Sequence, residues 1–131
     1  MKNTIFKLLE YSYYFSLFIL FVLYLFPGSI IGYFLYGNLG QQPDLISNPI
    51  GTSMNHLIFF FYLTTLGLIV RSEYKYFLNS FSFLFTISII LEWAHWLIPN
   101  RAFEYYDMFA NGIGVVIAYL LINIFLKLKI K

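Results

Sequence analysis

Four long apolar stretches alternate with short polar segments along the chain, at residues 5–26, 55–70, 76–97 and 108–126. An α-helix needs about 20 apolar residues to cross the hydrocarbon core of a bilayer, which is roughly 30 Å thick. The second stretch is the shortest of the four, and the others are close to that length. The pattern therefore predicts an all-α protein, a bundle of four transmembrane helices that forms a single domain over residues 1–131.

Turn residues separate these helices. Pro27 and Gly28 end the first stretch, Pro99 follows the third, and Ser53 is expected to be the N-cap of the second. Residues 30–36 are apolar but too short to span, so we expect them to lie in the membrane interface or to re-enter among the helices. Residues 37–53 are rich in Gly, Gln, Pro and Asn, which predicts a loop.

The first stretch has some features of a signal peptide, because Lys2 and Lys7 precede its apolar run. Glu10 lies inside that approach, however, and residues 25–29 lack the small-x-small pattern of a cleavage site. We therefore expect this stretch to be retained as a helix.

The composition supports a membrane environment. Apolar residues make up 60% of the chain and charged residues only 11%, whereas a soluble domain carries roughly 25% charged residues. Cysteine is absent, which excludes disulfides, thiolate metal sites and cysteine nucleophiles. The net charge of +2 is too small to suggest a nucleic-acid partner.

The basic residues predict the orientation in the membrane. With four crossings, the two chain ends and the loop after the second helix share one side, and this side holds Lys2, Lys7, Arg71, Lys75, Lys127, Lys129 and Lys131. Only Arg101 lies on the other side. Because cytoplasmic segments are enriched in Lys and Arg, both termini are expected in the cytoplasm, and residues 27–53 and 98–107 outside it.

This topology brings six polar residues from separate segments to the outer membrane boundary. They open the second helix, close the third, lie in the loop that follows it, or open the fourth: His56, Glu92, His95, Arg101, Asp107 and Asn111. On the fourth helix the same face continues with Gly114 and Ala118, and small residues there are typical of close helix packing.

Each of these residues has a structural and a functional interpretation. Glu92 is either a structural ion-pair partner or a ligand contact, since an unpaired carboxylate below the interface is costly. His95 suits either an interfacial position or the site, and Asp107 is either a first-turn helix acid or a site residue. Arg101 is expected to bind Glu92, Asp107 or an anionic ligand such as phosphate. Asn111 and Gly114 fit packing better than catalysis.

A metal or another cofactor is not expected. The Glu92-x-x-His95 step, together with His56 and Asp107, offers ligand types that zinc or iron accept. The chain nevertheless lacks a His-Glu-x-x-His motif and a second Glu-x-x-His step.

The second half of the chain resembles VanZ-like membrane proteins. The resemblance rests on the run from Glu92 to Arg101, EWAHWLIPNR, followed by Asp107, Asn111, Gly112 and Gly114, with His56 opening the second helix. The family pattern has Glu-x-x-Gln, an Arg after a proline-containing turn, and Asp-x-x-x-Asn-x-x-Gly. The match covers residues 52–120. The chain departs from it at His95, where the family has Gln, and at Thr52 and Ser53, where it often has Asp-Lys.

The resemblance implies a protein of the bacterial cytoplasmic membrane with four or more helices, and a type associated with resistance to the glycopeptide teicoplanin. The expected function is non-enzymatic binding of a lipid head group, a lipid-linked cell-wall precursor or a partner membrane protein at the outer polar residues. One alternative is an enzyme that acts on a lipid-linked phosphate or glycan, with proton transfer by His95, Glu92 or Asp107. The other alternative is a structural subunit of a larger membrane complex.

Overall fold

The computed structural model describes residues 2–43 and 51–129, and every regular element among them is helical. The helices are α1 (Lys2–Leu25), α2 (Ile30–Tyr36), α3 (Gly51–Arg71), the 3-10 turn η1 (Phe77–Asn79), α4 (Phe81–Ala94) and α5 (Tyr105–Lys129). The all-α prediction is thus confirmed. Among the described residues, α1, α3 and α5 are long and apolar enough to cross a membrane, and α4 is apolar but shorter.

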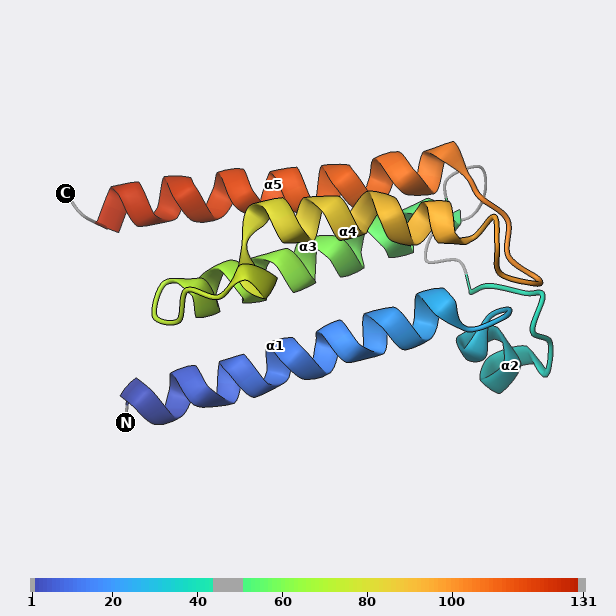
Figure 1. The fold of residues 1–131 in the computed structure, drawn as a ribbon, viewed down its shortest axis with the longest axis horizontal. Coiled ribbons are helices and arrows are strands. Elements are labelled where there is room, and N and C mark those ends of the chain that lie inside the picture. The colour runs from blue at the N-terminus through green and yellow to red at the C-terminus, as the bar shows by residue number, and fades with distance from the viewer. Residues whose placement is uncertain (1, 44–50, 130–131) are drawn as a thin grey trace.

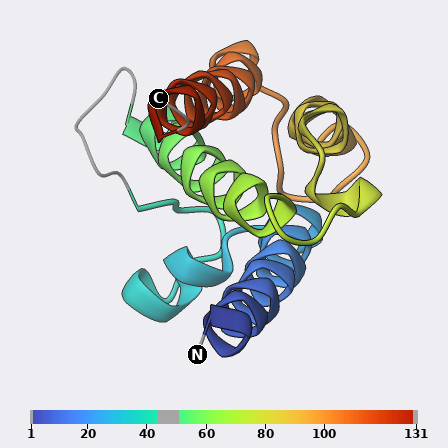
Figure 2. The ribbon, with the colours of Figure 1, turned by 90° about the vertical axis from the view of Figure 1, so that its left-hand side faces the viewer.

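The long helices run along one axis, and the two chain ends lie at the same end of the bundle (Figure 1). The opposite end carries α2 and the connection from α4 to α5 (Figure 1). Seen along the axis, α3 occupies the centre, with α1 on one side and α5 on the other, while α4 lies beside α3 and α5 (Figure 2). The most extensive packing is between α3 and α5.

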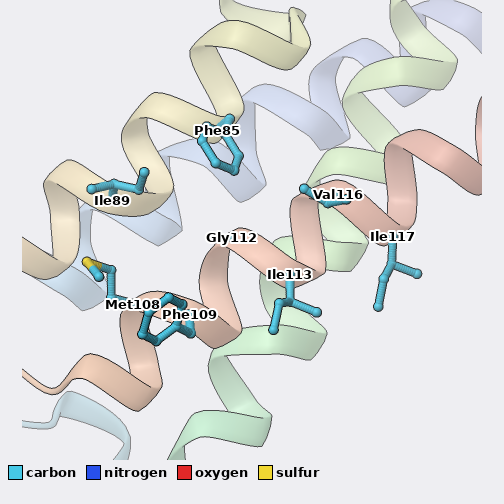
Figure 3. A pocket seen from close by; sticks show the side chains of 8 residues that line it. All are labelled: Phe85, Ile89, Met108, Phe109, Gly112, Ile113, Val116 and Ile117. Atoms are coloured by element: carbon cyan, nitrogen blue, oxygen red, sulfur yellow. The ribbon is translucent and has the colours of Figure 1, made fainter.

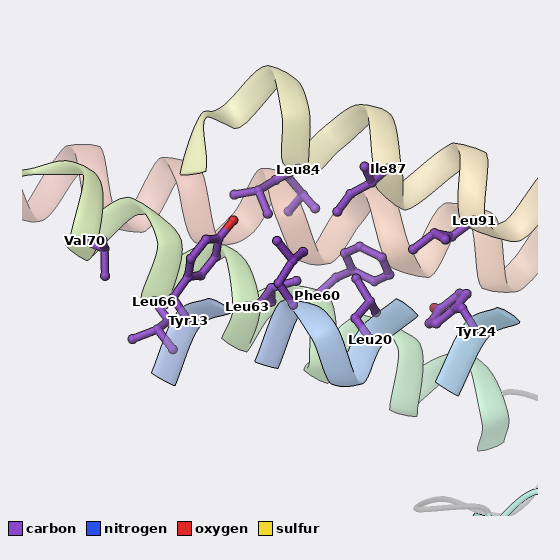
Figure 4. Packing of buried hydrophobic residues seen from close by; sticks show 12 residues of the cluster. Tyr13, Leu20, Tyr24, Phe60, Leu63, Leu66, Val70, Leu84, Ile87 and Leu91 are labelled. Atoms are coloured by element: carbon purple, nitrogen blue, oxygen red, sulfur yellow. The ribbon is translucent and has the colours of Figure 1, made fainter. Parts of the chain in front are cut away.

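The apolar core lies between α1, α3 and α4, with one contribution from α5 (Figure 4). It consists of Tyr13, Leu17, Leu20, Tyr24, Phe60, Leu63, Leu66, Val70, Leu84, Ile87, Leu91 and Val115. Large apolar side chains such as Phe15, Phe18 and Phe125 remain exposed on the outer faces. Such an exposed apolar surface on long apolar helices is typical of a membrane protein.

The third predicted stretch is not one helix. The structure divides residues 76–97 into η1 and α4, and Asn79 explains the division. This asparagine is fully buried; its Nδ2 donates to the Tyr74 carbonyl, and its Oδ1 accepts from the Tyr76 amide. Asparagine side chains that bond nearby backbone in this way compete with helical hydrogen bonding. Ser80 then caps α4 by accepting from the Phe83 amide.

The second predicted helix begins earlier than expected. Ser53 was predicted to be its N-cap, but α3 starts at Gly51, so Ser53 lies within the first helical turn. Its hydroxyl donates to Oδ1 of Asp107 in α5, so the side chain links two helices. The predicted loop over residues 37–53 lies partly outside the described residues, which end at Pro43 and resume at Gly51.

The short apolar segment after α1 forms the two-turn helix α2. Ser29 caps its start by accepting from the Gly32 amide, and Gly37 ends it in the left-handed conformation. A Cβ on Gly32 would lie 1.6 Å from the Gln41 carbonyl oxygen. Only glycine therefore lets the chain after α2 fold back tightly onto that helix.

Candidate functional site

Five of the six predicted polar residues meet at the end of the bundle that carries α2. His56 comes from α3, Glu92 from α4, His95 from the residue that caps α4, and Asp107 and Asn111 from α5. Hydrogen bonds and close ion pairs join them, and all are buried. Two further residues belong to the same network. We call the full set the polar cluster: Tyr24, Ser53, His56, Glu92, His95, Asp107 and Asn111.

Asn111 connects four helices at the centre of the polar cluster. Its Nδ2 donates to the Ser88 carbonyl of α4 at 3.1 Å, and its Oδ1 accepts from the Tyr24 hydroxyl of α1 at 2.8 Å. The same oxygen lies 3.2 Å from Nδ1 of His56 on α3. Because the amide is fully buried and both its ends are bonded, it fixes the position of the helices around it.

Glu92 is a fully buried carboxylate with two histidines beside it. Nδ1 of His95 donates to its Oε1 at 3.2 Å, and the backbone amide of Glu104 donates to the same oxygen at 3.2 Å. Its Oε2 is 3.8 Å from Nδ1 of His56 and has no hydrogen-bond partner among the described residues. Oε1 therefore accepts two hydrogen bonds, whereas Oε2 can still accept a hydrogen bond or bind a cation.

Asp107 lies in the first turn of α5, where its negative charge complements the helix dipole, and it also contacts two residues of α3. Its Oδ1 accepts from the Ser53 hydroxyl, and its Oδ2 is 3.5 Å from Nε2 of His56. His56 thus lies between two carboxylates, with Glu92 near one ring nitrogen and Asp107 near the other.

Arg101 does not bond to the carboxylates. Its Nη2 donates to the Leu23 carbonyl, and its Nε donates to the Phe26 carbonyl at 3.3 Å. The Arg101 side chain therefore caps the C-terminal end of α1. A cation at this end of a helix satisfies unpaired carbonyls and the helix dipole. Burial lowers the pKa of the Arg101 guanidinium, while Tyr24 and Glu92 oppose that shift.

Sequence reasoning missed Tyr24 and Ser53. The Tyr24 hydroxyl lies 2.6 Å from Nδ1 of His56, and its ring stacks on His95 with centroids 5.3 Å apart. A tyrosine near the end of an apolar helix is typical of an interfacial belt, so its type and position carried no specific signal. The position of Ser53 gave a weak indication that it belongs to the site, because Ser53 lies three residues before His56 and shares its helix face.

Gly114 and Ala118 lie where α5 meets α3. Ala118 is fully buried, and a Cβ on Gly114 would lie 2.5 Å from the Leu57 carbonyl oxygen and 3.0 Å from the Phe61 amide nitrogen. The two backbones therefore approach so closely that only glycine fits. This contact brings Asp107 and Asn111 next to His56.

A small cavity of about 130 Å³ borders the polar cluster. His56, His95, Tyr24 and Arg101 form part of its wall, and apolar residues such as Ile30, Ile31 and Phe59 form another part. Nε2 of His95 has no hydrogen-bond partner in the described part of the chain, although the residue is only 4% exposed. A buried polar atom without a partner is costly, so this nitrogen favours a ligand or water in the cavity.

A larger groove of about 320 Å³ lies between α4 and α5 (Figure 3). Its lining is glycine and apolar side chains only: Phe85, Ile89, Met108, Phe109, Gly112, Ile113, Val116 and Ile117. It presents no polar side chain that could orient a ligand, so it is a poorer candidate for a specific binding site than the smaller cavity.

The polar cluster can bind an anionic group, hold and move protons, or hold a cation. Two imidazoles and a guanidinium line the cavity, and each imidazole lies beside a carboxylate. Such pairs are suited to binding and to acid–base chemistry alike. No protein-family model, curated protein or solved structure matches this chain.

Proposed function

We propose that this chain is a VanZ-like protein of the bacterial cytoplasmic membrane that binds the anionic head group of a membrane lipid or of a lipid-linked cell-wall precursor. The observation that carries the proposal is the composition of the cavity wall. Arg101 presents hydrogen-bond donors to an anion, and Ile30, Ile31 and Phe59 present apolar surface to a hydrocarbon chain. A wall divided in this way suits an amphiphile.

The size of the cavity limits what it holds. Its volume of about 130 Å³ is smaller than the roughly 300–1,000 Å³ of pockets that enclose drug-sized ligands. It therefore accommodates a phosphate or a small head group, while the rest of the lipid remains in the bilayer. Arg101 retains unused N–H groups beyond its bonds to Leu23 and Phe26, and a guanidinium matches phosphate geometry.

The proposed topology has four crossings with both termini in the cytoplasm. The arrangement in Figure 1 supports it, since both chain ends lie opposite the polar cluster. Of the seven basic residues in the described part of the chain, all except Arg101 belong to that opposite end, which favours its cytoplasmic location. The polar cluster would then open on the outer side of the membrane.

The topology can be tested with single cysteines, because the chain has none. Gln41 and Lys75 are both exposed, on opposite ends of the bundle. We expect Gln41→Cys to react with a membrane-impermeant maleimide on intact cells, and Lys75→Cys to react only after permeabilisation. Labelling of both variants in intact cells would contradict the proposed arrangement.

Lipid binding can be tested by native mass spectrometry of the detergent-purified protein with dioleoyl phosphatidic acid. A charge-assisted hydrogen bond contributes about 1.5–3 kcal/mol, so we expect Arg101→Gln to weaken the adduct roughly 10- to 100-fold. Arg71→Gln is the matched control, since Arg71 also donates to a backbone carbonyl but lies at the other end of the bundle. Arg101→Lys keeps the charge and should restore part of the binding.

The outcomes separate the three functional classes. Preference for phosphatidic acid over phosphatidylcholine, lost in Arg101→Gln but not in Arg71→Gln, supports head-group binding. Equal adducts with all variants contradict it and favour a structural subunit. An enzyme is the second candidate, because each imidazole lies beside a carboxylate as a general base requires. Release of inorganic phosphate from the bound lipid would identify it.

A further inference from the structure

Three potential metal ligands from three different helices meet inside the polar cluster. His56, Glu92 and Asp107 each offer one ligand atom, and these atoms all lie within 4.8 Å of one another. All three side chains are buried. Zinc binds nitrogen and carboxylate oxygen at about 2.0–2.2 Å, so two ligands of a tetrahedral ion lie about 3.4 Å apart. The 3.5 Å between Nε2 of His56 and Oδ2 of Asp107 matches that separation.

The hydrogen bonds around His56 leave Nε2 as the ligating nitrogen. Tyr24 has one hydroxyl proton, and it goes to Oδ1 of Asn111. The 2.6 Å contact between Tyr24 and Nδ1 of His56 is then a bond donated by that nitrogen. In a neutral imidazole Nε2 consequently carries a lone pair, and it faces a carboxylate oxygen of Asp107. A metal cation between these two acceptors would satisfy both of them.

The surroundings of these residues resemble the outer shell of a metal site. A metal-bound histidine usually donates its other N–H to a fixed partner, and a ligating carboxylate usually accepts a hydrogen bond on its other oxygen. Tyr24 fixes His56 in this way, and the Ser53 hydroxyl bonds the second oxygen of Asp107. Glu92 follows the same pattern, because His95 and the Glu104 amide bond its Oε1 while Oε2 remains unpartnered. This Oε2 lies nearest Nδ1 of His56, at 3.8 Å, so a rotation of the Glu92 side chain would bring it to an ion bound at Nε2.

The net charge of these buried residues also favours a bound cation. Two buried carboxylates carry two negative charges, and the ion pairs they make among the described residues are with histidines, not with Lys or Arg. Burying uncompensated charge is costly. One divalent cation would neutralise both carboxylates with His56 uncharged, and His56 also lines the cavity, which gives an ion a route of access.

We propose that His56, Glu92 and Asp107 bind one divalent metal ion of the zinc class, a mixed nitrogen and oxygen site suited to Zn²⁺, Mn²⁺ or Fe²⁺. The sequence predicted no metal because each ligand comes from a different helix, so no local spacing reveals the set. The metal site borders the same cavity but is argued separately from the lipid proposal, which depends on Arg101.

The test is a titration of the chelator-treated, detergent-purified full chain with Co²⁺, which substitutes for zinc and absorbs visible light when protein-bound. We expect a band that saturates at about one Co²⁺ per chain and disappears when Zn²⁺ is added. Asp107→Asn and Glu92→Gln should each weaken binding at least tenfold. Glu104→Gln is the matched control: it removes an exposed carboxylate next to the site and should bind as the unsubstituted protein does.

The unsubstituted protein decides the outcome even if the ligand variants fold poorly. A chain that gives no saturable Co²⁺ band, and whose thermal unfolding Zn²⁺ does not raise, overturns the proposal. A band that persists in folded Asp107→Asn and Glu92→Gln also overturns it. Phosphatidic acid adducts measured with chelator present report on the lipid proposal alone, so the two proposals can fail separately.

Discussion

Replacing Glu92 with leucine is expected to lower the free energy of unfolding by about 1–3 kcal/mol for each buried donor that it leaves without an acceptor. Leucine has a similar volume, so the effect is not that of a cavity. The substitution removes the acceptor of His95 and of the Glu104 amide, and the oxygen nearest His56. The measurement is denaturant- or heat-induced unfolding in detergent, followed by circular dichroism.

Glu104→Leu is the control for this experiment. Partial burial raises the pKa of the Glu104 carboxyl, and the carboxylates of Asp107 and Glu92 raise it further. A raised carboxyl pKa means that folding disfavours the charged form, so the ionised group opposes folding above that pKa. Removing it should leave stability at neutral pH unchanged or slightly higher. Equal losses for both substitutions would show that Glu92 has no special structural role.

Replacing Gly114 with alanine is expected to destabilise the bundle by about 1–3 kcal/mol, the range typical of overpacking. The added methyl would lie 2.5 Å from the Leu57 carbonyl oxygen and 3.0 Å from the Phe61 amide nitrogen. These are backbone atoms of α3, so relief requires α3 and α5 to separate. That separation would also pull Asp107 and Asn111 away from His56.

Gly112→Ala is the matched control two residues earlier on α5. Its Cβ would lie 3.6 Å from a Phe85 ring carbon, an ordinary van der Waals contact. Alanine is favoured over glycine in a helix by about 1 kcal/mol, so this variant should be as stable as the original chain or more stable. The two substitutions therefore have opposite expected signs in the same unfolding assay, and a loss of stability in both would contradict the close-packing interpretation of Gly114.

Much of the fold could be predicted because the length and apolar content of a segment show whether it can cross a bilayer as a helix. The positions of α1, α3 and α5 follow from their apolar runs, with ends displaced by a few residues. The meeting of His56, Glu92 and Asn111 could be predicted as well. Antiparallel helices joined by short connections bring the end of one next to the start of another, so depth in the bundle follows from chain order.

The parts that could not be predicted depend on contacts between distant residues. Arg101 was expected beside Glu92 or Asp107, but unpaired carbonyls at the end of α1 compete for the same donors. Tyr24 joins the polar cluster through the rotation of α1 about its axis, which an almost uniformly apolar helix does not encode. The break at Asn79 depends on side-chain bonds to Tyr74 and Tyr76, which a hydropathy pattern does not reveal.

The shortness of α4 has a consequence for the lipid around the protein. Its 14 residues, at about 1.5 Å each, cover about 21 Å, whereas a hydrocarbon core is about 30 Å thick. In the four-crossing arrangement that we propose, local thinning of the bilayer beside α4 would match the length of this helix. Phosphates of the nearest lipids then sink toward the C-terminal end of this helix, where Glu92 and His95 lie. Local thinning would thus place lipid head groups close to Glu92 and His95.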